Sequence, residues 1–118
     1  MCIRDRACSV AHKVLEIIDE EKILSNVKSL SEFLLAGIND IIENHKDKIT
    51  SVRGRGFMLG IKCEVENTLI AETALNNGLL LVPAADNIIR LLPPLNTEKD
   101  DIEQFFNLLN ITLENLPR

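Results

Sequence analysis

The sequence predicts an α+β domain in which helices cover one side of a small, mainly antiparallel sheet of about four short strands. Three observations carry this prediction. Apolar residues recur at helical spacing over residues 7–44, the pattern then changes to short runs typical of strands, and helical spacing returns after residue 97. The expected order of elements is α-α-ββ-α-ββ-α, which is typical of helices packed on one face of a sheet.

Two helices are expected first. Apolar residues at 10, 11, 14, 15 and 18 predict a helix over 7–18, and an acidic stretch follows it. A longer apolar pattern predicts a second helix over 22–44, interrupted only by Gly37. Each helix has one apolar face, so each needs a sheet or another helix to cover it.

Four strands and two helices follow. Runs at 49–52 and 57–63 predict two strands joined by RGRG, and runs at 79–83 and 88–92 predict two more, joined by AADN and ended by two prolines. Between the pairs, a helix should start near Asn67 and end at Gly78. Thr97 with Asp100 resembles a capping box for the last helix. The buried face of that helix should be Ile102, Phe105, Phe106, Leu109, Leu113 and Leu116.

Composition excludes several classes of function. A chain of 118 residues forms one domain, and its net charge of −5 argues against binding nucleic acid. No apolar run approaches the roughly 18 residues of a membrane span, and the N-terminus lacks the apolar core of a signal peptide. The three cysteines, Cys2, Cys8 and Cys63, are an odd number without metal-ligand spacing. This pattern favours a reducing cytoplasm and no metal site.

The segment VRGRG at 52–56 sets two arginines among two glycines. It is either a turn that contacts an anion or a hairpin turn with solvated arginines. The segment lacks the spacing of a phosphate-binding loop and the aromatic residues of an RNA-binding tract, which favours the hairpin turn. His12 and His45 are expected on the surface, and Cys8 is expected to pack rather than to act as a nucleophile.

Arg90 stands inside the apolar run NIIRLLPPL. Alternation along a strand puts Arg90 on one face with Ile88 and Leu92, and puts Ile89 and Leu91 on the other. A guanidinium in such a place needs either a ligand or a structural ion pair. Its planar donor fork suits a carboxylate ligand, and any of the 18 Asp and Glu residues could supply an ion pair instead. The residues alone leave both alternatives open, and they predict no catalytic set.

Several strings of the sequence resemble the C-terminal domain of class III pyridoxal-phosphate-dependent aminotransferases. They are ACSVAHKVLEIIDEEKILSNV, VRGRGFMLGIKC and NGLLLVPAADNIIRLLPPLNTEKDDIEQ, in matching order and spacing, and the resemblance covers residues 7–118. The acetylornithine aminotransferase branch is the most similar. The string RLLPPLN favours acetylornithine or succinylornithine enzymes over ornithine or 4-aminobutyrate relatives.

The resemblance implies the small C-terminal domain of a fold-type I transferase, with Arg90 gripping the α-carboxylate of the substrate. The complete enzyme would be a cytoplasmic homodimer of arginine biosynthesis that acts on small amino acids and 2-oxo acids, with no nucleic-acid or membrane partner. It would move an amino group from N-acetylornithine to 2-oxoglutarate, with pyridoxal phosphate as the electron sink.

The chain also departs from the family pattern. The family's Schiff-base lysine, the aspartate that pairs with the pyridine nitrogen and the phosphate-binding loops belong to a large domain that would precede residue 7. None of the lysines present has the Schiff-base context, so the chain alone is expected to be inactive and to bind no cofactor. Residues 1–6, MCIRDR, do not match the family's GGNPL and are expected to be a non-native or mis-joined start. The rival hypotheses are a free-standing regulatory module that binds a small molecule, and a structural domain with Arg90 in an ion pair.

Overall fold

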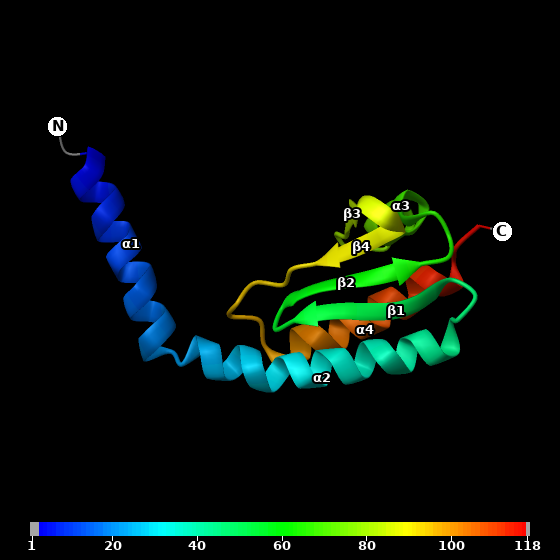
Figure 1. The fold of residues 1–118 in the computed structure, drawn as a ribbon, viewed down its shortest axis with the longest axis horizontal. Coiled ribbons are helices and arrows are strands. Elements are labelled where there is room, and N and C mark those ends of the chain that lie inside the picture. Colours follow the sequence, from blue (N-terminus) through cyan, green and yellow to red (C-terminus); the bar gives the residue numbers. More distant parts are fainter. Residues whose placement is uncertain (1–2, 118) are drawn as a thin grey trace.

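The structure, a computed structural model, describes residues 3–117. Within that range, four α-helices and four strands follow one another in the predicted order, which confirms the α+β class (Figure 1). The helices are α1 (Ile3–Glu20), α2 (Ile23–Asn44), α3 (Asn67–Asn76) and α4 (Lys99–Glu114). The strands are β1 (Ile49–Arg55), β2 (Met58–Cys63), β3 (Val82–Ala84) and β4 (Ile88–Leu91), and a short 3-10 turn, η1 (Ala85–Asn87), joins the last two.

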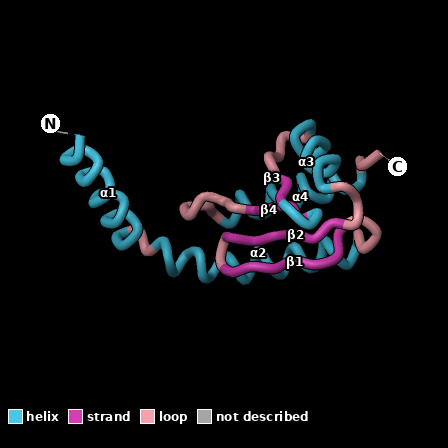
Figure 2. Tube along the Cα trace, turned by 45° about the horizontal axis from the view of Figure 1, so that its top comes forward, coloured by secondary structure: helices cyan, strands magenta, loops and turns pink. Residues whose placement is uncertain are grey.

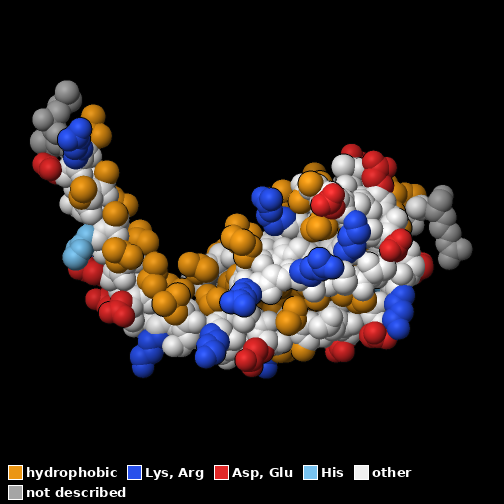
Figure 3. Space-filling view, viewed as in Figure 1, with side chains coloured by type: hydrophobic (Ala, Val, Ile, Leu, Met, Phe, Trp, Pro, Cys, Tyr) orange, Lys and Arg blue, Asp and Glu red, His pale blue; other side chains and the backbone are white. Residues whose placement is uncertain are grey.

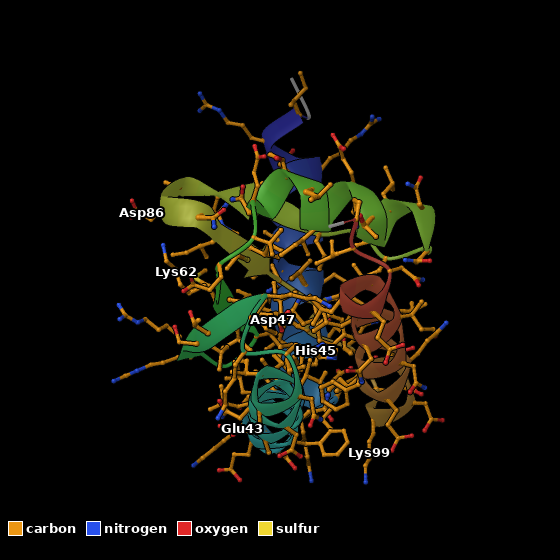
Figure 4. The ribbon with its side chains drawn as sticks, turned by 90° about the vertical axis from the view of Figure 1, so that its right-hand side faces the viewer. Glu43, His45, Asp47, Lys62, Asp86 and Lys99 are labelled. Carbon is orange, nitrogen blue, oxygen red and sulfur yellow. The ribbon has the colours of Figure 1, made fainter. Side chains whose placement is uncertain are left out.

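The four strands form one antiparallel sheet in the order β1-β2-β4-β3. Strand β2 is central: Ile61 pairs with Val52 of β1 on one side and with Ile89 of β4 on the other. Helices α2, α3 and α4 lie against one face of this sheet, as the end-on view in Figure 4 shows. Their buried side chains form a single core with those of the strands, including Leu34, Ile70 and Leu113. No helix of residues 3–117 covers the opposite face of the sheet.

Gly37 interrupts the apolar pattern of α2 because α4 crosses α2 closely at this point. A Cβ added at Gly37 would lie 2.0 Å from Cζ of Phe106. The Phe106 ring also contacts Phe33, with ring centroids 5.6 Å apart and tilted planes. Of the six residues predicted to be buried on the last helix, four are buried and Phe105 and Phe106 are only half-buried; Leu116, one of the four, lies just beyond the end of α4.

Helix α1 projects away from the rest of the molecule (Figures 1 and 2). None of its described residues is buried, and its apolar face is open: Val10 is 64% exposed and Leu15 is 67% exposed. Most of the predicted apolar face is therefore left uncovered by the described residues. Among residues 3–117, no helix combines the length and the apolar character that a membrane crossing requires.

Three predicted boundaries are wrong. Helix α1 begins at Ile3 rather than at Ala7, with Asp5 in its first turn. Strand β1 continues through Arg55, so RGRG is mostly strand and not the turn. The strand predicted over 79–83 is β3, Val82–Ala84, because the N–H of Leu79 donates to the carbonyl of Ala74 and the segment after α3 still belongs to the helix end.

The predicted capping box of the last helix is also wrong by one residue. Glu98 is the N-cap of α4, and its N–H donates to the Asp101 carboxylate over 3.0 Å. Thr97 does not cap the helix because its side chain is buried and its hydroxyl donates to the carbonyl of Pro94 in the preceding loop.

The cysteines divide between the core and the surface. Cys63 is buried, and burial raises the pKa of its thiol to about 11, although a hydrogen bond to the backbone of Ile89 and the charge of Lys62 lower it. Cys8 is exposed on α1, so the packing expected for it is not found among the described residues. Cys2 lies outside the described residues.

Cys63 should therefore be inert while the domain is folded. At pH 8 we expect a thiol reagent to modify Cys8 quickly and Cys63 only after denaturation, measured by mass spectrometry of the digested protein. Because the folded pKa lies above that of an unfolded thiol, the free energy of unfolding should fall as pH rises from about 8.5 toward 11. A Cys63→Ala variant should lose this part of the pH dependence. Equal modification of both thiols in the folded protein would contradict the buried position of Cys63.

The open apolar face of α1 predicts weak self-association of the isolated chain. Analytical ultracentrifugation should show a concentration-dependent sedimentation coefficient, and a hydrophobic dye should bind the folded protein. Leu15→Lys should reduce both effects, whereas Lys13→Ala, which keeps the apolar face, should not. A monomer at high concentration that binds no dye would contradict the prediction.

Candidate functional site

The open face of the sheet carries Arg90. Along β4 the side chains alternate as predicted: Ile89 and Leu91 are buried against the helices, while Arg90 is exposed on the other face. Register places Gly60 of β2 opposite Arg90 on one side and Val82 of β3 on the other. Gly60 has no side chain, and the Ile88 side chain reaches over it: a Cβ added at Gly60 would lie 2.9 Å from Cγ2 of Ile88.

Arg90 takes part in no ion pair within residues 3–117. The ion pairs of that range are His12 with Glu16, Lys13 with Glu16, and Glu43 with Lys46. The internal ion pair that the sequence allowed for Arg90 is therefore absent from the described part of the chain. The Arg90 guanidinium is therefore free to bind a group from outside residues 3–117.

Arg53 of β1 lies in the same row, because Gly60 pairs with Arg53 on one side and with Arg90 on the other. The alternation also puts Arg55 and Lys62 on this open face. No Asp or Glu lies within β1, β2, β3 or β4, so the face is cationic in a chain of net charge −5 (Figure 3). Arg53 and Arg55 are exposed as expected, but they project from a strand rather than from a turn.

A groove of about 920 Å³ is lined by Arg90 of β4 and by residues at the start of α4, among others. Its walls are mostly apolar and come from the segments 79–82 and 91–94, from Leu34 and from Ile102 and Phe105. Arg90 is the one cationic side chain among its described lining residues, and Glu98 and Asp101 also line the groove. A cationic fork in a mostly apolar groove can orient a small molecule that carries a carboxylate.

The remaining predicted residues lie away from this groove. His12 is exposed on α1, with Nε2 2.9 Å from Glu16, and His45 is half-buried at the end of α2. The described residues contain no group of three or more His, Cys, Asp or Glu side chains placed to hold a metal. Two residues that the sequence analysis did not single out, Asn67 and Asn87, form the densest polar contacts near β4.

The described residues do not fit pyridoxal phosphate on their own. A covalent cofactor site needs a lysine directed at it, and the two half-buried lysines are engaged elsewhere. Lys48 donates to the carbonyl of Leu113, and Lys62 donates to the carbonyl of Asp86, beside which it lies in Figure 4. No lysine lines the groove at Arg90. The described residues therefore offer no attachment point for the cofactor.

Comparison with known proteins gives a consistent picture. Residues 5–113 match the family model of aminotransferase class-III. The acetylornithine aminotransferase of Mesorhizobium japonicum is 36% identical over 101 residues, which are 86% of this chain and 25% of that protein. Ornithine aminotransferase 1 of Staphylococcus saprophyticus is 33% identical over 108 residues, which are 92% of this chain and 27% of that protein.

The fold agrees with the sequence comparison. The crystal structure of acetylornithine aminotransferase from Elizabethkingia anophelis superposes with a TM-score of 0.86 at 29% identity, over 92% of this chain and 28% of that one. The chain thus spans about a quarter of the length of these relatives. With the family model matched along most of its length and its fold shared with a solved member, the chain belongs to the class-III aminotransferase family.

Proposed function

We propose that this chain is the C-terminal small domain of a longer transaminase of the acetylornithine aminotransferase type. The full-length enzyme transfers an amino group from N-acetylornithine to 2-oxoglutarate, giving N-acetylglutamate semialdehyde and glutamate. It works in arginine biosynthesis, in the cytoplasm and as a homodimer. Pyridoxal phosphate is its cofactor, held by residues outside this chain.

The environment of Arg90 is the observation that supports the proposal. Arg90 is exposed, takes part in no ion pair within residues 3–117, and lines a mostly apolar groove. N-acetylornithine and 2-oxoglutarate each carry an α-carboxylate, which a planar fork binds through two parallel hydrogen bonds. One arginine on a preorganised strand can therefore orient both substrates in turn.

Ornithine is a second candidate for the amino donor, because an ornithine aminotransferase is 33% identical to this chain over 108 residues. Ornithine has the same α-carboxylate and lacks the acetyl group, so Arg90 has the same function with either donor. Catalytic efficiencies measured with both donors decide between them.

Substitution of Arg90 in the full-length enzyme tests the proposal. Arg90→Ala removes one partner of a buried charge pair in the substrate complex, a loss of about 2–5 kcal/mol, with about 1.4 kcal/mol for each tenfold change. The catalytic efficiency kcat/KM for N-acetylornithine should therefore fall about 30-fold to several thousand-fold. Arg90→Lys keeps the charge but not the fork and should lie between. Stopped-flow measurement of each half-reaction should show both impaired.

Arg55→Ala is the matched control, because Arg55 is an exposed arginine on the same sheet face but two strands away. We expect its kinetics to stay close to those of the unsubstituted enzyme. If Arg90→Ala only lowers the melting temperature and leaves both half-reactions near normal, Arg90 is structural and the proposal fails.

A further inference from the structure

Two asparagines fasten the turn between β3 and β4 to the rest of the domain. The amide Nδ2 of Asn67 donates to the carbonyls of Ala84 at 2.8 Å and Ile88 at 3.0 Å, on either side of the turn. The Nδ2 of Asn87, within the turn, donates to the carbonyls of Cys63 at 2.8 Å and Val65 at 2.9 Å.

A fifth hydrogen bond joins the two residues, since the N–H of Asn67 donates to Oδ1 of Asn87 over 2.7 Å. We call these two side chains and their five bonds the asparagine clasp. The clasp ties the end of β2 and the start of α3 to both ends of the β3–β4 turn. Lys62 adds a sixth tie, from β2 to the carbonyl of Asp86.

The clasp holds a backbone that would otherwise be disfavoured. Asp86 has φ 60° and Asn87 has φ 56°, so two consecutive residues other than glycine are left-handed. Such conformations persist where surrounding contacts determine them. Asparagine tolerates this region better than most residues, and at position 87 it also supplies three of the five bonds.

The position of Arg90 depends on this turn. Strand β4 has only four residues and β3 only three, so few ladder hydrogen bonds define their register. Pro93 and Pro94 have no N–H and cannot extend the backbone hydrogen-bond ladder beyond β4. The register of β4 is therefore set at its other end, by the β3–β4 turn. A slip of one residue would move Arg90 from the open face to the face that the helices cover.

We propose that Asn67 and Asn87 are positioning residues, which fix the register of β4 and thereby direct the Arg90 guanidinium at the substrate carboxylate. This inference rests on the proposed function, in which Arg90 binds that carboxylate. Neither asparagine is assigned a contact with the substrate. Both act through the strand that carries Arg90.

The test compares two amines in the full-length enzyme: N-acetylornithine and N-acetyl-1,4-diaminobutane, which is the same amine without the α-carboxylate. The carboxylate preference is the ratio of their kcat/KM values. Asn87→Gly keeps a residue suited to the left-handed turn but removes three hydrogen bonds of the clasp. We expect it to lower the carboxylate preference by about tenfold to a hundredfold, because the reduced efficiency should be confined to the amine that Arg90 grips.

Asn77→Ala is the matched control. It removes one side-chain hydrogen bond, to the carbonyl of Thr73 at 3.0 Å, near the other end of α3, and should leave the carboxylate preference unchanged. Asn87→Asp is the second variant should Asn87→Gly not fold: it keeps the acceptor for Asn67, loses the two donated bonds and places a carboxylate oxygen against the carbonyls of Cys63 and Val65. A reduced preference is expected for it too.

Equal losses with both amines, or a lower melting temperature with an unchanged preference, would overturn the positioning of Arg90 by the clasp. If Arg90→Ala abolishes the preference and the Asn87 variants keep it, the clasp proposal alone is overturned. If the unsubstituted enzyme has no carboxylate preference, the proposed function fails and the clasp proposal fails with it.

Discussion

The burial of one face of the sheet by α2, α3 and α4 is the constraint on which the rest of the structure depends. It requires Ile89 and Leu91 of β4 to point toward the helices, and it therefore places Arg90 on the open face. Turning β4 over would expose two large apolar side chains, at about 1.5–3 kcal/mol each, and would bury an unpaired charge at a cost of several kcal/mol. Apolar burial thus decides where the charged side chain goes. The asparagine clasp fixes the register along the strand.

The order of the elements and the face on which Arg90 lies could be predicted from the sequence, because both depend on the local pattern of apolar residues. The helical spacing in α2 and α4 and the alternation around Arg90 determine which side chains face the core, and the structure follows both. The family relationship also follows from strings that keep their order and spacing, and the matched family model confirms it. The assignment of Arg90 to the substrate carboxylate stays a prediction, since the structure shows only that its fork is exposed and free of ion pairs within residues 3–117.

The features that the sequence did not predict depend on contacts between distant segments. Gly54 lies within β1, paired with Leu59, and not in the turn. A side chain would not fit there, because its φ is 135° and a Cβ would lie 2.0 Å from the carbonyl oxygen of Met58. Thr97 looks like a helix cap, but the loop that follows the prolines uses its hydroxyl. The clasp joins residues that are 20 positions apart in the sequence, so no local pattern indicates it. The one local signal is the sequence Asp86-Asn87, because asparagine tolerates the left-handed backbone conformation that the turn requires.

The central claim is that Arg90 binds the substrate carboxylate. A crystal structure of the full-length enzyme with glutarate, an unreactive dicarboxylate, tests it most directly. If Arg90 is the carboxylate ligand, two of its guanidinium nitrogens should lie about 2.7–2.9 Å from the two oxygens of one ligand carboxylate. The Asn67 and Asn87 contacts should be the same with and without the ligand. An Arg90 guanidinium paired with an Asp or Glu of the protein, with both ligand carboxylates held by other residues, would contradict it.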